Sequence, residues 1–326
     1  MKKILIILGP TGVGKTHVSL LLSKALQTEI ISSDSMQIYK HMDIGTAKPS
    51  IQERQEIRHH MIDIVDPWEY YSTGEYINDV QPIINGIHEN KKIPIVVGGT
   101  GLYIKAMTRG IFKGPSADWG LRDSLLKREE KERGFVYGYL KSIDPESASR
   151  IMPTDIRRIV RALEVCLKSN KSMSDMQRLM TEPLPYEFIK IGLTRHREEL
   201  YQMIEQRVDN MIKQGLIEEV KDVLRLIEEH STGVLTSSSQ SNLPSILPSM
   251  QAIGYKEIAL YLKNKISIDD SIRLIKKRSK MYAKRQFTWF KKEKGIHWID
   301  ITGLYDPERV LKKITDIFDF QALLNQ

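Results

Sequence analysis

The sequence predicts an α/β fold in which a doubly wound parallel sheet is interrupted by an inserted all-helical domain. Apolar runs such as residues 4–8 and 93–97 are short enough for buried strands, and segments with apolar residues at helical spacing alternate with them. Between residues 115–185 this alternation stops and only helical patterns remain. We therefore expect a discontinuous core, residues 1–114 and 186–326, with an insertion between its two parts.

A glycine-rich loop follows the first apolar run and matches the phosphate-binding pattern G-x-x-x-x-G-K-[ST] at every position. Apolar residues then recur at helical spacing over residues 18–26, so strand, loop and helix follow one another. In that arrangement the loop N–H groups and the positive end of the helix converge on one anion site. Lys15 would neutralise phosphate oxygens, and Thr16 would offer its hydroxyl to Mg²⁺. The sequence thus predicts a P-loop NTPase-like fold that binds a di- or triphosphate. The loop consists of Gly9, Pro10, Thr11, Gly12, Val13, Gly14, Lys15 and Thr16.

A second expected strand, residues 29–33, ends at Asp34. In doubly wound folds the ligand crevice lies outside the carboxyl ends of the parallel strands, which places Asp34 beside the P-loop. Its carboxylate could bind a metal, accept a proton or orient an acceptor amine or hydroxyl. The structural alternative is that Asp34 and Ser35 only form the turn.

A third buried strand, residues 93–97, runs into a glycine turn at Gly98 and Gly99. P-loop ATPases commonly place an acidic residue at this position to help hold Mg²⁺, and this sequence has none there. The glycines allow a backbone or a ligand to approach closely, and Thr100 can donate a hydroxyl into the crevice. This pattern argues against ATP hydrolysis and for binding of a second group beside the phosphates.

The inserted domain carries arginines beside an apolar stripe. Apolar residues after residue 154 recur at helical spacing, and three arginines lie off that stripe. A further arginine, Arg122, lies early in the first helix of the insertion. These side chains can touch phosphates, and a solvated basic face is the open alternative. The stripe contains Ile156, Ile159, Val160, Leu163 and Leu167, and the arginines are Arg157, Arg158 and Arg161.

After the insertion, strand alternation returns at residues 187–193 and is expected to complete the parallel sheet. The next helix carries Arg207 on the flank of its apolar face, where the side chain could reach back into the crevice. Residues 231–248 are rich in Ser, Asn and Pro and lack periodicity, which predicts a mobile loop. Another helix opens at residues 254–257.

The net charge of +8 is concentrated in one segment. Residues 271–292 hold nine cationic residues and no acidic one, and subtracting nine from +8 leaves −1 for the rest of the chain. Tyr282, Phe287, Trp289 and Phe290 interleave with these cations. This composition is typical of a surface that meets a nucleic-acid backbone and stacks on bases. The alternative is a solvated basic helix whose aromatic residues face the core.

Length and composition limit the class of protein. A chain of 326 residues with 41% hydrophobic content suffices for a large domain with an insertion. No apolar run approaches the roughly 18 residues of a membrane span, and the first expected strand leaves no room for a signal peptide. We therefore expect a cytoplasmic protein with no membrane partner. Cys166, the only cysteine, excludes internal disulfides, argues against a zinc cluster and is interpreted as a core thiol.

Several short motifs follow one another in a fixed order. They are G-P-T-G-V-G-K-T at 9–16, D-S-M-Q-I-Y at 34–39, D-I-G-T-A-K-P at 43–49, H-H to D at 59–66, V-G-G-T-G-L-Y at 97–103, R with R-A-L-E-V at 158–165, Q to E at 251–257, and K-R-Q with T-W at 284–289. Taken together they resemble the tRNA dimethylallyltransferases (tRNA isopentenyltransferases), and the resemblance covers residues 4 to about 292. The single cysteine does not fit the C-terminal zinc finger of the eukaryotic members, so the bacterial type is the closer match.

The resemblance implies transfer of the dimethylallyl group from dimethylallyl diphosphate to N6 of adenosine 37 in the tRNA anticodon loop, with release of diphosphate. It implies that the P-loop and Arg207 bind the diphosphate, with Mg²⁺ at Thr16. Asp34 would be the general base, and Lys15, Thr16, Thr100 and Arg207 would share the catalytic role. We expect the enzyme to act as a monomer. The implied tRNA-binding residues are Asp34, Ser35, Met36, Gln37, Thr100, Arg122, Arg157, Arg158, Ile159, Val160, Arg161, Gln251, Gly254, Tyr255, Lys256 and Arg285.

Three rival functions fit part of the sequence. A small-molecule kinase of the nucleotide or shikimate type would use the same P-loop and turn over ATP, but it gives no reason for the basic segment at 271–292. A prenyltransferase acting on free adenine nucleotide would need no surface that grips an anticodon arm. A non-catalytic RNA-binding P-loop protein would not depend on Asp34.

Overall fold

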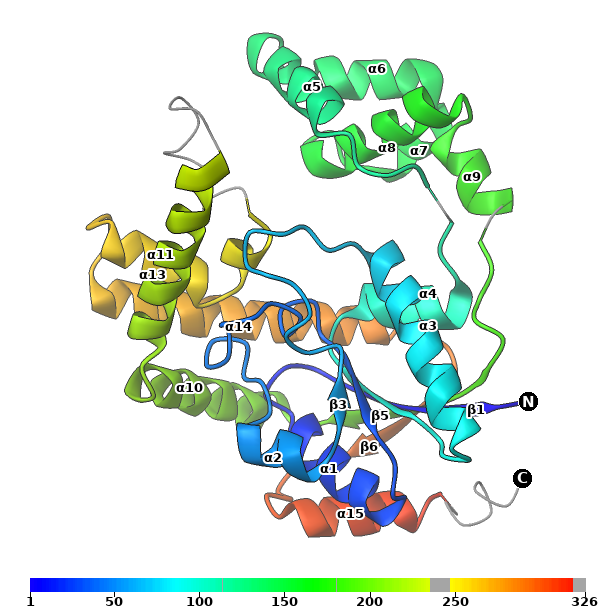
Figure 1. Ribbon diagram of the computed structural model, residues 1–326, viewed down its shortest axis with the longest axis vertical. Coiled ribbons are helices and arrows are strands. Elements are labelled where there is room, and N and C mark those ends of the chain that lie inside the picture. The colour runs from blue at the N-terminus through cyan, green and yellow to red at the C-terminus, as the bar shows by residue number, and fades with distance from the viewer. Residues whose placement is uncertain (113, 180, 235–246, 319–326) are drawn as a thin grey trace. The chain divides into compact units, whose positions relative to one another are not determined.

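The chain divides into two units in the computed structural model (Figure 1). The core unit contains residues 1–104 and 185–326, and the helical unit contains residues 105–184. The helical unit holds most of the expected insertion and begins upstream of it. The described residues are 1–112, 114–179, 181–234 and 247–318.

A parallel sheet forms the centre of the core unit and confirms the predicted α/β class. Over the described residues it has six strands in the order β3-β2-β4-β1-β5-β6. The expectation that residues 187–193 complete the sheet is wrong, because β6 pairs with β5 in parallel at the outer edge. The strands are β1 (Lys3–Leu8), β2 (Ile30–Ser33), β3 (His59–His60), β4 (Ile95–Gly98), β5 (Glu187–Thr194) and β6 (Ile296–Asp300).

The register of the sheet brings the ends of three strands to one level. Gly98 at the end of β4 pairs with Leu8 of β1 on one side and with Ser33 of β2 on the other. A Cβ at Gly98 would lie 2.1 Å from the carbonyl oxygen of Ser33, so this close approach requires glycine. The P-loop, the turn at Asp34 and the second glycine turn therefore leave the sheet side by side at its carboxyl edge.

Helices surround the sheet in the core unit. They are α1 (Lys15–Ala25), α2 (Ile51–Glu56), α3 (Thr73–Glu89), α10 (Arg197–Lys213), α11 (Leu216–Val234), the 3₁₀ turn η2 (Ser249–Gln251), α13 (Tyr255–Leu262), α14 (Ile268–Phe290) and α15 (Pro307–Thr315). Helix α4 (Gly101–Arg109) begins in the core unit and ends in the helical unit. Helix α1 packs against α15, and α10 packs against α14 (Figure 1). Val18, Ile204 and Ala283 join α1, α10 and α14 to the sheet in one apolar cluster. A second cluster joins α11 to α13 through Val220 and Ile258.

The first residues of the predicted loop at residues 231–248 are helical. Helix α11 continues to Val234, so residues 231–234 are helical. Pro248 at the other end precedes η2. Residues 235–246 lie outside the described residues.

The helical unit has its own apolar core. Its helices are α5 (Trp119–Lys131), α6 (Phe135–Ile143), α7 (Pro145–Arg150), α8 (Ile156–Ser169) and α9 (Met173–Leu179). Ile159, Val160 and Leu163 of α8 are buried in this core, whereas Leu167 at the end of the expected stripe is 38% exposed. Cys166 is a buried free thiol, and burial raises its pKa.

Candidate active site

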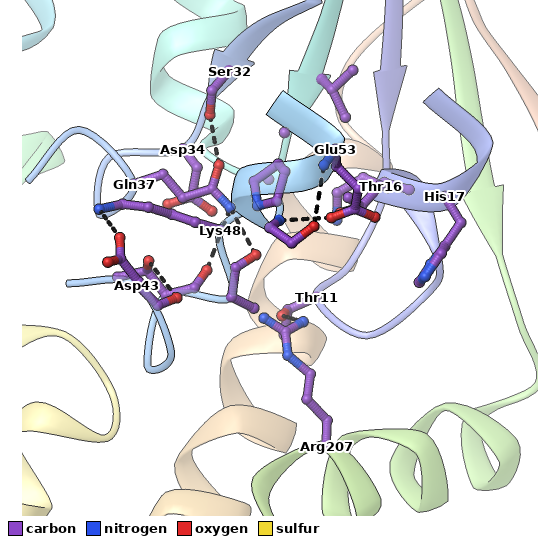
Figure 2. A pocket seen from close by; sticks show the side chains of 18 of the residues that line it. Thr11, Thr16, His17, Ser32, Asp34, Gln37, Asp43, Lys48, Glu53 and Arg207 are labelled. Carbon is purple, nitrogen blue, oxygen red and sulfur yellow. Dashed lines mark hydrogen bonds and ion pairs between the residues drawn. The ribbon is translucent and has the colours of Figure 1, made fainter. Parts of the chain in front are cut away.

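A cavity of about 800 Å³ opens at the carboxyl edge of the sheet in the core unit. Its walls come from the P-loop, the turn at Asp34, the loop after Met42, the start of α2 and one face of α10. Figure 2 shows side chains from these separate elements gathered around one space. The expected site residues that line it are Thr11, Gly12, Gly14, Lys15, Thr16, Asp34, Gln37 and Arg207.

The P-loop follows β1 in a backbone conformation that needs glycine. Gly14 caps α1 with a φ of 108°, and Gly12 has a φ of 81°, both in the left-handed region. A Cβ at Gly12 would also lie 2.9 Å from a side chain of α10. The Lys15 ammonium folds back over the loop and donates to the carbonyl oxygens of Gly9 and Pro10, both at 2.9 Å. The positive end of α1 and its first lysine therefore face the cavity together.

Lys15, Asp34 and Arg207 form a charged group in this cavity. Burial lowers the pKa of Lys15 to about 8, with the Asp34 carboxylate opposing this effect and the Arg207 guanidinium adding to it. Burial also lowers the pKa of Arg207, and the negative charge of Asp34 again opposes this effect. Arg207 Nη1 donates to Thr11 Oγ1 at 3.3 Å, so the guanidinium reaches the P-loop from α10. An anion held by the loop would meet two cations and one carboxylate.

Hydrogen bonds of Asp34 itself and of Thr100 hold the turn that carries Asp34. Asp34 Oδ1 accepts the backbone N–H of Met36 at 2.9 Å. Thr100 Oγ1 accepts the N–H of Ser35 at 2.9 Å, and the Thr100 N–H donates to the carbonyl oxygen of Ser33 at 3.1 Å. Thr100 is not among the residues that line the cavity. Its hydroxyl instead fixes the turn beside Asp34.

Two residues of α14, Gln286 and Tyr282, contribute to this site, although the sequence did not place either of them beside the P-loop. The side-chain amide of Gln286 accepts a hydrogen bond from the N–H of Thr11 at 2.8 Å. The same amide donates to the carbonyl oxygen of Gly99 at 2.9 Å. Gln286 therefore ties the P-loop to the second glycine turn. Tyr282 lines the cavity, and burial, followed by the charge of Asp34, raises its pKa. The one sequence signal for Gln286 is its place in the motif at 284–289.

Arg195, at the end of β5, supports the P-loop from behind. It is buried, and its Nε donates to the carbonyl oxygen of Val13 at 3.1 Å. The other guanidinium nitrogens donate to the carbonyl oxygens of Ile301 and Leu304 at 2.8 and 2.6 Å. Val13 itself is fully buried and does not line the cavity, so its side chain does not fit the expected diphosphate contact.

The loop of residues 43–48 forms another wall of the cavity. The Lys48 side chain is 1% exposed, and its ammonium donates to the carboxylates of Asp43 and Asp63 at 2.7 and 2.5 Å. It also donates to the carbonyl oxygen of Tyr39 at 2.7 Å. Lys48 is thus held within the loop, and its charge is matched by carboxylates rather than left to a ligand.

Gln37 connects that loop to β2. Its Nε2 donates to the carbonyl oxygens of Thr46 and Ala47 at 3.4 and 3.2 Å. Its Oε1 accepts the hydroxyl of Ser32 at 2.9 Å, and Ser32 precedes Asp34 by two residues. Figure 2 shows Gln37 beside Asp34 with the bond to Ser32 drawn.

The other core-unit residues expected to bind tRNA differ in exposure. Gln251 and Lys256 are exposed and hydrogen-bonded to each other at 3.2 Å, and Arg285 is exposed on α14. Tyr255 is fully buried, and Gly254 is buried before it. A tRNA contact of the Tyr255 side chain therefore does not fit the structure, because its ring belongs to the apolar cluster of α11 and α13.

In the helical unit, two of the expected tRNA contacts pair with the same buried carboxylate. Arg122 and Arg161 both pair with Glu164, whose side chain is fully buried. Arg161 also donates to the carbonyl oxygen of Pro115 at 3.1 Å. Desolvation of Glu164 raises its pKa, but the hydrogen bonds and these arginines outweigh that effect and lower it. These two arginines hold the start of α5 against α8.

The remaining residues of that set lie on opposite sides of α8. Arg157 and Arg158 are exposed, and Arg158 pairs with Asp155 at 3.4 Å. Ile159 and Val160 are buried, so their side chains do not face an RNA. The basic face of this helix is thus narrower than expected.

The basic segment at 271–292 forms most of α14. Phe290 is fully buried, and Trp289 lies on Gly101, where a Cβ would be 2.5 Å from the indole. Arg278 pairs with a buried carboxylate of α13. The expectation that Phe290 stacks on bases is therefore wrong, and the alternative in which aromatic residues face the core holds for it, while Trp289 is half-buried.

Metal ligands are sparse in the described part of the chain. No group of three or more His, Cys, Asp or Glu side chains is arranged there to hold a metal ion. Thr16 lines the cavity beside the P-loop, and Mg²⁺ is commonly bound by few protein oxygens together with phosphate and water. A hydroxyl at that place fits such a shared site.

Within the described residues, no helix has the length and apolar character needed to cross a membrane.

Comparison with known families matches residues 37–293 to the model described as IPP transferase. The chain belongs to the IPP transferase family. The resemblance noted in the sequence is thereby confirmed. The matched residues begin after the P-loop and Asp34.

Two curated relatives align with this family member over nearly its full length. The tRNA dimethylallyltransferase of Thermodesulfovibrio yellowstonii is 58% identical over 313 residues, which cover 96% of each chain. The tRNA dimethylallyltransferase of Thermotoga maritima is 42% identical over 314 residues, covering 96% of this chain and 97% of the relative.

Solved structures of the family share the fold. The full-length tRNA isopentenylpyrophosphate transferase of Bacillus halodurans is 36% identical, with a TM-score of 0.70 over 100% of this chain and 97% of that one. A eukaryotic dimethylallyltransferase acting on tRNA is 31% identical, with a TM-score of 0.83 over 100% of this chain and 80% of that one. The predicted P-loop NTPase-like fold is thereby confirmed.

Proposed function

We propose that this protein is a tRNA dimethylallyltransferase, which transfers the dimethylallyl group of dimethylallyl diphosphate to N6 of adenosine 37 in the tRNA anticodon loop. The observation that carries the proposal is that one cavity holds a P-loop, the cations of Lys15 and Arg207, and the carboxylate of Asp34. The shared name of the curated relatives supports it.

Stabilisation of the leaving group is the main task of the cations. A C–N bond forms at C1 of the prenyl chain while the C–O bond to diphosphate breaks, and negative charge grows on the diphosphate. Donors already aimed at that charge lower the barrier. Lys15, Arg207, the P-loop N–H groups and the positive end of α1 are these donors.

Asp34 is suited to the acceptor side of the reaction. Its carboxylate would orient the N6 amine and take the proton that the amine loses as the new bond forms. Thr100 acts through the N–H of Ser35 and is therefore a positioning residue for Asp34.

Mg²⁺ is the proposed cofactor, with Thr16 as the protein ligand beside the diphosphate oxygens. When bound, Mg²⁺ neutralises part of the charge on the leaving group. The hydroxyl of Thr16 lines the cavity at the first turn of α1, where it can supply one oxygen ligand.

Binding of tRNA requires cations that reach phosphates and a way to extrude the base. Enzymes that modify a base commonly take it out of its stack first. Arg157 and Arg158 of the helical unit and Lys284 and Arg285 of α14 are exposed and suited to phosphate contacts. We also propose a monomeric enzyme that acts in the cytoplasm.

The test is transfer of label from radiolabelled dimethylallyl diphosphate to unmodified tRNA or to free AMP, with Mg²⁺ and without ATP. Label in tRNA alone supports the proposal. Label in AMP would instead favour the enzyme that acts on free nucleotide. No transfer to either acceptor, together with ATP turnover, would favour the small-molecule kinase.

A further inference from the structure

A carboxylate outside the charged group of the cavity fixes the loop of residues 43–48. Glu219, in the first turn of α11, accepts three consecutive backbone N–H groups: those of Asp43 at 2.9 Å, Ile44 at 2.7 Å and Gly45 at 3.0 Å. Successive N–H groups that converge in this way form an anion-binding nest. Here the nest is filled by the protein's own carboxylate, through charge-assisted hydrogen bonds.

Tyr255 completes this anchor from α13. Its hydroxyl donates to Glu219 Oε1 at 2.5 Å. Burial, followed by the charge of Glu219, raises the pKa of Tyr255, so the hydroxyl keeps its proton and remains a donor at neutral pH. The ring also lies against Gly45, where a Cβ would be 2.4 Å from it. The phenol therefore fixes both the carboxylate and the backbone that the carboxylate holds.

The anchored loop lines the cavity and is linked to the Asp34 turn by hydrogen bonds of Gln37. Its residues Asp43, Ile44, Thr46, Ala47 and Lys48 line the cavity. Gln37 joins the loop carbonyls to Ser32, and the chain then leads directly into Asp34. A shift of the loop away from Glu219 would move a cavity wall and loosen the support of the Asp34 turn.

We propose that Glu219 and Tyr255 are positioning residues for the prenyl donor, because they hold the loop in the shape that forms the cavity wall. The identity of the donor rests on the proposed function. The motif at 251–257 then acts through the cavity loop by way of Tyr255, while its members Gln251 and Lys256 lie exposed at the surface.

Two variants of the full-length protein test this inference with Mg²⁺ present. Tyr255→Phe removes one hydroxyl and keeps the buried ring, and Glu219→Gln removes the charge and keeps the size. The Michaelis constants for dimethylallyl diphosphate and for tRNA are measured separately, together with amide hydrogen exchange of residues 42–48. Tyr261→Phe on α13 and Glu218→Gln on α11 are matched controls that make the same chemical change on the same helices.

We expect the Michaelis constant for dimethylallyl diphosphate to rise about fivefold in Tyr255→Phe, the effect of one lost hydrogen bond. It should rise further in Glu219→Gln, because each carboxylate oxygen accepts two hydrogen bonds and an NH₂ group in its place accepts none. The constant for tRNA should not change, and the amides of residues 43–45 should exchange faster. A higher constant for tRNA with an unchanged donor constant would overturn the inference and assign Tyr255 to RNA. Unchanged exchange and kinetics would also overturn it. A wild-type enzyme without transfer would refute the proposed function, and the exchange data would still decide whether Glu219 anchors the loop.

Discussion

Asp34 carries the acceptor chemistry of the proposed reaction, and a single substitution separates that role from folding. Asp34→Asn keeps the size and the oxygen that accepts from Met36, but it removes the base. We expect label transfer to fall by about 100-fold or more, because this is the usual contribution of a positioned general base. Affinity for tRNA should be retained. Single-turnover transfer and filter binding of tRNA measure the two effects.

Asp209→Asn is a suitable control for that experiment. Asp209 lies on α10 two residues from Arg207 and pairs with Lys276 at 2.7 Å, outside the cavity lining. Its loss should leave transfer unchanged. Transfer at the wild-type rate in Asp34→Asn would remove Asp34 from the mechanism.

Lys15 makes donor binding depend on pH. Its pKa of about 8 lies below the ordinary 10.5 because of burial, and a bound diphosphate favours the charged form. Binding should therefore take up a proton above pH 8, and donor affinity should fall as pH rises further, by at most about tenfold per pH unit. Calorimetry in two buffers of different ionisation enthalpy measures the uptake. Lys15→Arg, which stays charged, should lose this pH dependence.

Lys15 also makes the stability of the ligand-free protein depend on pH, but this stability rises with pH where donor affinity falls. Between the folded pKa of about 8 and the ordinary 10.5, the unfolded state binds more protons than the folded one. The contribution of Lys15 to the free energy of unfolding should therefore rise with pH across this window. Denaturant unfolding of the wild type and Lys15→Met at both ends of the window would show the difference.

At the scale of elements, the site depends on how closely β2 and β4 approach. Gly98→Ala would place a methyl group 2.1 Å from the backbone oxygen of Ser33, which only a shift of the strands can relieve. We expect a loss of about 3 kcal/mol or more in the free energy of unfolding, measured by urea denaturation. Gly86→Ala in α3, where a Cβ meets nothing within 4 Å, should instead stabilise the protein by about 0.5–1 kcal/mol. Equal effects at both positions would contradict this account of the sheet.

Helix α8 offers a test of tRNA binding that leaves its core intact. Arg157→Glu reverses an exposed charge and should weaken tRNA binding, lowering the slope of log affinity against log salt by about one. Arg178→Glu on α9 is the control, because Arg178 is already paired with Glu146. An unchanged slope for Arg157→Glu would make this face of α8 a solvated surface. Arg161→Glu is unsuitable, since it would oppose the buried carboxylate of Glu164.

The parts of the site that are local in sequence could be predicted, and those that depend on distant packing could not. The P-loop combines strand, glycines and helix within a few residues, so its pattern carries its own context. Gln286 is hydrogen-bonded to Thr11 although 275 residues separate them in the sequence, and no periodic pattern predicts such a contact. Strand β6 was missed for a related reason: as an edge strand it buries Ile299 but exposes His297, so it has no continuous apolar run.

Tyr255 and Phe290 show the limit of motifs and composition as guides to function. Phe290 occurs in a segment rich in cations and Tyr255 in a motif that the resemblance assigns to tRNA binding, yet both are fully buried. Composition gives the residues of a helix but not the direction in which each side chain points. Burial is decided by tertiary packing, here by the clusters around α13 and α14.

At the scale of the whole molecule, two separate apolar cores predict that stability is not uniform along the chain. Leu163→Ala removes a fully buried side chain from the core of the helical unit and should cost about 3 kcal/mol there. We expect faster hydrogen exchange in residues 119–179 and unchanged exchange in the strands of the core unit. Transfer to tRNA should fall while affinity for dimethylallyl diphosphate is kept. Equal acceleration in both units would mean that they unfold together.

Cys166 gives this enzyme an unusual experimental advantage. It is the only cysteine, its thiol is buried, and its raised pKa keeps the reactive thiolate scarce. Thiol-directed dyes should therefore leave the native chain unlabelled and react with cysteines introduced on the surface. Cysteines at Lys127 in the helical unit and Lys263 in the core unit, both exposed, would carry a fluorescence donor and acceptor without removal of any native thiol. Energy transfer between them would then follow the spacing of the two units through each turnover, as tRNA arrives and as diphosphate leaves.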